Sequence, residues 1–127
     1  AVGKVLPELN GKLDGIAMRV PVPDGSVVDL NVRLNQNVKE HDINEAVRAA
    51  SENGSLKNVL EYSTLPVVST DIIGNNCCAV FDSSATIVDE SKSNAVLYTW
   101  YDNEFGYTKQ VIRLAKFISG VRRLTYY

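Results

Sequence analysis

The most regular pattern along the chain is an alternation of apolar and polar residues between positions 26 and 34. Its apolar members are Val28, Leu30, Val32 and Leu34. A period of two predicts a β-strand with one buried and one wetter face. A second long strand is predicted at 94–101, which is rich in aromatic and β-branched residues. The apolar segment 16–20, followed by two prolines, predicts a further strand that we expect to pair with 26–34 as a hairpin.

Apolar residues recur at helical spacing in three places. The first is a short stripe within residues 2–9. In the second, Asp42 and Glu45 have the spacing of a capping box, apolar residues follow at helical intervals, and Gly54 stands where the helix is expected to end. The third helix is predicted from Phe105 to Ile118. Its expected buried stripe consists of Tyr107, Val111, Leu114, Ala115 and Ile118.

Shorter apolar runs predict additional strands at 59–62, 67–68, 77–81 and 86–88. Several neighbouring strands interspersed with helices are typical of the α+β class. We therefore expect a single domain over residues 1–127, with a mixed or antiparallel sheet and helices packed on one of its faces.

The composition is that of an ordinary globular protein, with 45% hydrophobic and 22% charged residues among 127. A net charge of −2 favours neither a nucleic-acid partner nor a membrane surface. The adjacent Cys77 and Cys78 lack the spacing of a metal or disulfide motif, and we interpret them as strand residues of a protein in the reducing cytoplasm. The only histidine, His41, is interpreted as a loop residue beside a helix start. The sequence predicts no metal site.

Two residues stand out as candidates for ligand binding. Arg19 interrupts an apolar segment, where a guanidinium suits a bidentate contact with a phosphate or carboxylate. An arginine that simply faces solvent gives the same pattern. Asn103 lies in a polar turn between aromatic residues, and its amide is able to pair with a planar carboxamide. Capping of the following helix by Asp102 or Asn103 explains the same turn without a ligand.

Several strings resemble one family in their order and spacing. They are AVGKVLPELNGKL at 1–13, GIAMRVPVP at 15–23, SVVDL at 26–30, VSTD at 68–71 and WYDNEFGY at 100–107. They resemble the C-terminal part of the catalytic domain of phosphorylating glyceraldehyde-3-phosphate dehydrogenases. The resemblance implies an enzyme that converts glyceraldehyde 3-phosphate, inorganic phosphate and NAD or NADP to 1,3-bisphosphoglycerate. It also implies a homotetrameric, cytoplasmic parent enzyme.

The resemblance implies roles for three residues. Arg19 matches the family's phosphate-binding arginine, and Asn103 matches the asparagine that binds the nicotinamide carboxamide. Tyr107 matches a tyrosine that packs near the nicotinamide. The family's Ser-Cys-Thr-Thr-Asn nucleophile segment, its catalytic histidine and its dinucleotide-binding domain have no counterpart in this sequence. We therefore assign no catalytic residue here, and we expect the isolated chain to be inactive.

Two alternatives remain open at this stage. The first is a stand-alone oligomerisation or interaction domain that uses the same fold without chemistry. The second is a fragment of the related erythrose-4-phosphate dehydrogenases, which tend to differ from this sequence around Tyr101, in the string WYDNEFGY at 100–107.

Overall fold

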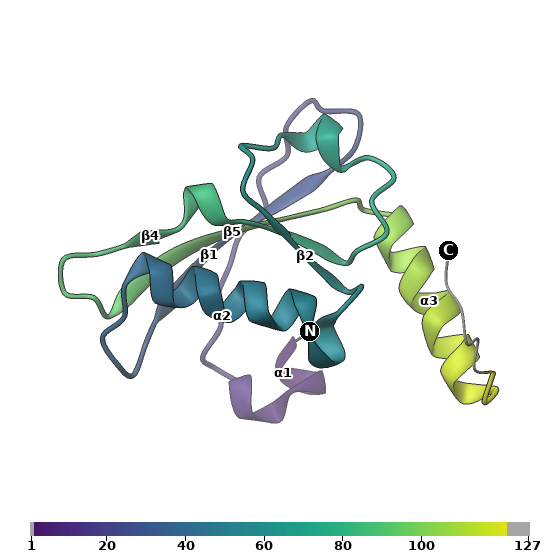
Figure 1. The fold of residues 1–127 in the computed structure, drawn as a ribbon, viewed down its shortest axis with the longest axis horizontal. Helices are drawn as coiled ribbons and strands as arrows, with labels where there is room; N and C mark the ends of the chain where they lie inside the picture. Colours follow the sequence, from purple (N-terminus) through teal and green to yellow (C-terminus); the bar gives the residue numbers. More distant parts are fainter. Residues whose placement is uncertain (1, 122–127) are drawn as a thin grey trace.

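The computed structural model describes residues 2–121, which form short and long helices and a five-stranded sheet (Figure 1). In chain order the elements are α1 Val2–Val5, η1 Pro7–Leu9, β1 Ser26–Arg33, α2 Glu40–Glu52, η2 Gly54–Leu56, β2 Leu60–Ser63, η3 Ser69–Ile72, β3 Ala79–Asp82, η4 Ser83–Ala85, β4 Ile87–Val88, β5 Asn94–Tyr101 and α3 Phe105–Ile118, where η denotes a 3₁₀-helix.

The sheet is mixed, and its strand order is β1-β5-β3-β2, with β4 also paired to β5. β5 pairs antiparallel with β1 along its full length, from Ser26 opposite Tyr101 to Arg33 opposite Asn94. β3 is antiparallel to β5 and parallel to β2. This mixed sheet with accompanying helices confirms the predicted α+β class, and both long predicted strands form.

The buried core is small and lies where β3 crosses the middle of the sheet. Its buried hydrophobic residues are Ile72, Val80, Phe81 and Ala95. The ring of Phe81 stacks on that of Tyr62 in the parallel neighbour β2, with the ring centroids 5.9 Å apart. β3 is an inner strand with a paired neighbour on each edge, whereas β1 is an edge strand.

α2 lies across one face of the sheet and packs against β2 (Figure 1). It starts one turn earlier than the capping-box pattern suggested, since Lys39 is the N-cap and Asp42 is the third helical residue. The Asp42 carboxylate accepts a hydrogen bond from the Lys39 backbone N–H at 2.9 Å, which satisfies one of the free donors at the helix start. The prediction that Asp42 caps the helix was therefore wrong by three residues. His41 is an exposed residue of the first turn rather than a loop residue.

The hairpin predicted between 16–20 and 26–34 does not form. Residues 16–20 belong to no strand, and Ile16 is 90% exposed. β1 instead pairs with β5, which is far away in the sequence, so a local pattern could not identify its partner. The predicted strand at 67–68 is also absent, because Val68 is the N-cap of η3. The predicted first helix is reduced to α1 followed by η1.

Burial in β1 differs from the expected single buried face. Val28 and Leu30, on the predicted core side, are both exposed. No other described element covers that part of the strand closely enough to bury them.

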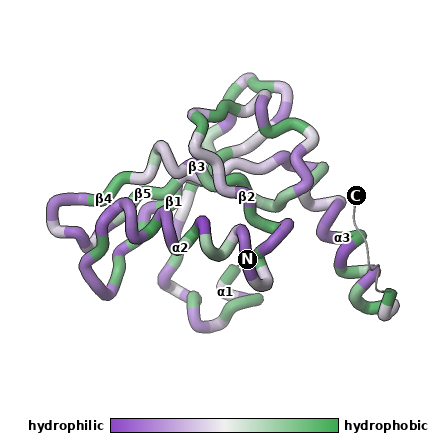
Figure 2. Tube along the Cα trace, in the orientation of Figure 1, coloured by the Kyte–Doolittle hydropathy of each residue, from purple (hydrophilic) through white to green (hydrophobic). Residues whose placement is uncertain are grey.

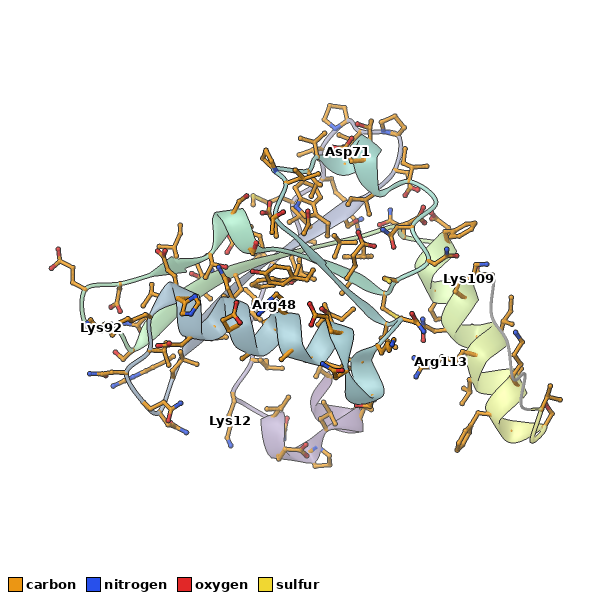
Figure 3. All side chains as sticks on the ribbon, viewed as in Figure 1. Lys12, Arg48, Asp71, Lys92, Lys109 and Arg113 are labelled. Carbon is orange, nitrogen blue, oxygen red and sulfur yellow. The ribbon has the colours of Figure 1, made fainter. Side chains whose placement is uncertain are left out.

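α3 has the predicted bounds but not the predicted burial. The helix extends from the end of β5 away from the sheet, and hydrophobic positions are spread along it (Figures 1 and 2). Four residues of the expected buried stripe are large hydrophobics that remain exposed: Tyr107, Val111, Leu114 and Ile118. The prediction of a buried stripe was therefore wrong for residues 2–121 taken alone. The side chain of Arg113, by contrast, points toward the rest of the chain (Figure 3), and its Nη2 donates to the Ser55 carbonyl oxygen at 3.5 Å.

Among the helices within residues 2–121, none combines the length and apolar character that a bilayer crossing requires. Residues 122–127 lie outside the described residues.

Candidate functional site at the junction of β5 and α3

Asp102 is the centre of the junction between β5 and α3. It is only 4% exposed, and both of its carboxylate oxygens accept backbone hydrogen bonds. Oδ1 accepts from the N–H groups of Glu104 at 2.9 Å and Phe105 at 2.6 Å, which are free donors at the start of α3. Oδ2 accepts from the N–H of Gly74 at 2.9 Å. The N-cap position of α3 is Glu104, whose side chain makes no capping bond. Asp102 instead satisfies the N–H groups at the helix start, as one interpretation of the sequence had it, and also ties the helix to the loop after η3.

These contacts determine the protonation state of Asp102. The N–H of Phe105, followed by that of Gly74, holds the pKa of the Asp102 carboxyl below its usual range, while burial acts in the opposite direction. The group is consequently a carboxylate at neutral pH, with its negative charge at the positive end of the α3 dipole.

Gly106, the second residue of α3, allows the helix to approach the loop closely. A Cβ built at this position would lie 2.6 Å from the carbonyl oxygen of Cys77, which is closer than real side chains come. The first turn of α3 therefore packs directly on the backbone at Cys77 and Cys78, and a glycine is needed for this contact.

Asn103 lies at the same junction, on the exposed side. Its Oδ1 accepts a hydrogen bond from the hydroxyl of Ser26 at 2.6 Å. Ser26 is the first residue of β1 and is opposite Tyr101 in the β1–β5 register, which explains how a residue 77 positions away reaches Asn103. Tyr107 follows one turn later on α3 and is 71% exposed. Asn103 and Tyr107 thus share the N-terminal end of α3.

Arg19 lies in the exposed, strand-free segment before β1. Within residues 2–121, no hydrogen bond or ion pair involves its guanidinium, and no recorded contact joins it to Asn103 or Tyr107. The structure therefore brings two of the three predicted site residues to one helix end and leaves Arg19 on a separate segment.

The carboxylates of Asp24, Asp102 and Glu104 also converge here, with oxygen atoms within 4.8 Å of one another. The oxygens of Asp102 are already engaged by three backbone donors.

Cys77 and Cys78 are free thiols just before β3, partly covered by their surroundings. Burial is the main cause that raises the pKa of both thiols. They are therefore protonated at neutral pH, a state that makes cysteine a poor nucleophile.

Sequence reasoning did not single out Ser26 or Gly106. Both roles depend on contacts across the fold: Ser26 meets Asn103 through strand pairing, and Gly106 meets a loop that precedes it by about thirty residues. A glycine one residue inside a predicted helix was the one local signal that could have indicated a close backbone approach.

Comparison with known proteins identifies the family. The family described as "Glyceraldehyde 3-phosphate dehydrogenase, C-terminal domain" matches residues 1–103. A glyceraldehyde-3-phosphate dehydrogenase of Streptomyces coelicolor is 48% identical over 120 residues, and glyceraldehyde-3-phosphate dehydrogenase 1 of Schizosaccharomyces pombe is 51% identical over 120; each alignment covers 94% of this chain and 35% of the relative. The cytosolic enzyme of Chondrus crispus is 49% identical over 122 residues, 96% of this chain and 36% of its own length.

The chain therefore spans about a third of the curated relatives that it matches. Similarity of this extent, over nearly all of the chain and across a bacterium, a fungus and an alga, agrees with the α+β fold described above. The chain belongs to the glyceraldehyde-3-phosphate dehydrogenase family, in which it corresponds to the C-terminal domain.

Proposed function

We propose that the chain is the C-terminal part of the catalytic domain of a cytoplasmic, phosphorylating glyceraldehyde-3-phosphate dehydrogenase. The whole enzyme converts glyceraldehyde 3-phosphate, inorganic phosphate and NAD or NADP to 1,3-bisphosphoglycerate. The observation that carries this proposal is the identity of 48–51% over 94% of the chain to two proteins named glyceraldehyde-3-phosphate dehydrogenase. This chain contributes binding residues, and we assign the nucleophile and the general base to segments outside residues 1–127.

Asn103 fits the nicotinamide end of the dinucleotide. Its amide is exposed, Oδ1 is held by Ser26, and Nδ2 has no hydrogen-bond partner among residues 2–121. A free amide donor at a helix start suits the carbonyl of a carboxamide. Tyr107 offers an exposed aromatic ring one turn away, consistent with packing at the same end. When bound, the nicotinamide ring is the hydride acceptor.

Arg19 is assigned to a phosphate group in the active site. Its side chain is exposed, and no carboxylate neutralises it within the described part of the chain. A guanidinium in that state offers two parallel N–H donors to a phosphate.

The extent of exposed surface supports a larger assembly. The chain exposes 9887 Å², whereas a folded monomer of 14.0 kDa is expected to expose about 6,700 Å². The excess of roughly 3,000 Å² on this one chain is larger than the roughly 1,000–2,500 Å² per partner that permanent interfaces commonly bury. We propose that the rest of the enzyme and neighbouring subunits of a homotetramer cover this surface.

A chimeric enzyme tests the proposal. The matched 120 residues of the Streptomyces coelicolor relative are replaced by this chain, and cofactor reduction is followed spectroscopically with glyceraldehyde 3-phosphate and phosphate. We expect the chimera to be active and the isolated chain to be inactive. A chimera that unfolds cooperatively but reduces no cofactor with this aldehyde contradicts the proposal, and activity with erythrose 4-phosphate alone identifies the related dehydrogenase instead.

Variants of the chimera test the assignment of Arg19. Arg19→Ala is expected to raise the KM for phosphate by about tenfold to a hundredfold, the effect of losing a charged hydrogen bond. Arg19→Lys keeps the positive charge but not the paired donors of the guanidinium, so its KM for phosphate should lie between those of the wild type and Arg19→Ala. Arg33→Ala is the matched control, since Arg33 lies on β1 and is assigned no role. Equal KM values for the Arg19→Ala and Arg33→Ala variants would remove Arg19 from the site.

A further inference from the structure

The hydrogen bond between Ser26 and Asn103 joins a hydroxyl and an amide oxygen. The Ser26 Oγ lies 2.6 Å from Oδ1 of Asn103. Hydrogen bonds from a hydroxyl to an oxygen are typically about 2.7–2.8 Å long, whereas those between nitrogen and oxygen are about 2.9–3.0 Å. The separation fits the pairing in the structure, in which the hydroxyl donates to the amide oxygen.

This hydrogen bond leaves Asn103 with one polar group that is able to contact a ligand. With Oδ1 occupied by Ser26, the group free to meet a ligand is Nδ2, a donor. A hydroxyl both donates and accepts, so rotation of the amide by 180° would present Oδ1, an acceptor, to the ligand and leave Nδ2 to donate to Ser26. With Ser26 as the donor, as in the structure, Asn103 offers Nδ2.

Both partners are held by backbone contacts. The carboxylate of Asp102, the residue before Asn103, accepts from the N–H groups of Glu104 and Phe105 after it and from that of Gly74. Ser26 follows Gly25, which has a φ of +88. A Cβ built at Gly25 would lie only 2.8 Å from the Ser69 carbonyl oxygen, so the turn has no space for a side chain there. The N–H of Gly25 also donates to Asp24 Oδ1 at 2.7 Å. The turn before Ser26 and the hydrogen bonds of Asp102 therefore fix the two ends of the contact.

We propose that Ser26 is a positioning residue of the dinucleotide site: its hydroxyl holds Oδ1 of Asn103 so that Nδ2 donates to the carbonyl oxygen of the bound carboxamide. The inference rests on the function proposed above for Asn103. Ser26 itself touches no ligand and acts through Asn103.

The first test is a double-mutant cycle in the chimeric enzyme. Ser26→Ala is expected to raise the Kd for the dinucleotide, measured by equilibrium dialysis, and with it the KM, about threefold to tenfold, the effect of losing one neutral hydrogen bond. Asn103→Ala is expected to raise it further. In the Asn103→Ala background, Ser26→Ala should cause no additional change, because its target is gone. Ser26→Thr, which keeps the hydroxyl and suits a strand, should restore the wild-type value.

The second test uses the 3-acetylpyridine analogue of the dinucleotide, which keeps the ring carbonyl and replaces the amide NH₂ by a methyl group. If Asn103 donates to the carbonyl, Asn103→Ala raises the KM for the analogue and for the natural cofactor by similar factors. A rise confined to the natural cofactor means that Asn103 accepts from the NH₂ group, and this overturns the proposed orientation.

The outcomes separate the two proposals. If Asn103→Ala leaves the KM for the dinucleotide unchanged, the proposed role of Asn103 fails and the role of Ser26 fails with it. If Asn103→Ala raises the KM but Ser26→Ala does not, or if the two effects add in the double variant, the Ser26 proposal alone is overturned. Ser119→Ala is the matched control, since its hydroxyl bonds to the Lys116 carbonyl at the far end of α3.

Discussion

Gly106 is the position at which a single added methyl group is expected to disturb the junction most directly. An alanine Cβ there would lie 2.6 Å from the Cys77 carbonyl oxygen, whereas ordinary carbon–oxygen contacts are about 3.3–3.6 Å long. The first turn of α3 or the loop before β3 must therefore move by roughly 0.7–1 Å. The obstructing atom belongs to the backbone, so no side-chain rotation relieves the contact.

Two opposing effects determine the size of the destabilisation. Overpacking of this kind costs about 1–3 kcal/mol, and alanine is favoured over glycine in a helix by about 1 kcal/mol. Because the contact is between backbone groups, we take the upper part of the first range. The free energy of unfolding should then fall by about 1–2 kcal/mol. A fall of about 1.4 kcal/mol, in the middle of this range, is a tenfold change in the folding equilibrium constant.

Urea unfolding, followed through the fluorescence of the single tryptophan, Trp100, measures this change. Gly15→Ala is the matched control, because the space around Gly15 is open and its φ is not positive. That variant should be neutral or more stable by about 0.4–1 kcal/mol, through the lower entropy of its unfolded chain. A Gly106→Ala variant that is as stable as the wild type would refute the close backbone contact at this position.

Three further outcomes are expected. Ile72→Ala should lower the free energy of unfolding by about 2–5 kcal/mol, because Ile72 is 2% exposed, whereas Ile73→Ala, at 51% exposure, should change it by less than about 0.5 kcal/mol; urea unfolding of both variants checks this contrast. Hydrogen bonds from Asn94 and Ser91 lower the pKa of Asp89 from 3.8 to about 2, so its stabilising effect is complete above about pH 4 and is lost as the pH falls through about 2; Asp89→Asn should flatten the dependence of the urea midpoint on pH in that window. Phe117 is 82% exposed, and Phe117→Ser should reduce self-association of the isolated chain, measured by light scattering.

The elements that the sequence predicted best are those with strong local signals. β5 and α3 have the predicted bounds, because aromatic and branched residues favour an extended chain and because Asp102 binds the N–H groups at the helix start. The predicted start of α2 was misplaced because an aspartate is able to stand either at the N-cap or at the third helical residue. The spacing of Asp42 and Glu45 alone does not distinguish these two positions. The pairing of β1 was missed because strand partners are selected by contacts across the fold.

The candidate site was predictable in its residue types but not in its geometry. The polar turn at 102–104 indicated both a cap and a binding amide. In the structure Asp102 binds the N–H groups at the helix start, and Asn103 keeps Nδ2 without a hydrogen-bond partner within residues 2–121. Ser26 became part of this site only through the β1–β5 register, which no local pattern encodes. Arg19 remains a prediction from sequence, since nothing within residues 2–121 places it beside Asn103.

The same physical reason explains both main errors in predicted burial, at α3 and at β1. A periodic apolar stripe shows that a face is meant to be covered, but the covering atoms belong to other elements. On α3, Arg113 faces the body of the chain while Leu114 and Ile118 face outward, the reverse of the usual arrangement for a surface helix. On β1, Leu30 is likewise exposed on its predicted core side. Apolar patches of this extent on two separate elements are unusual for a protein that acts alone. We therefore infer that these apolar patterns are matched to neighbouring surfaces outside residues 2–121.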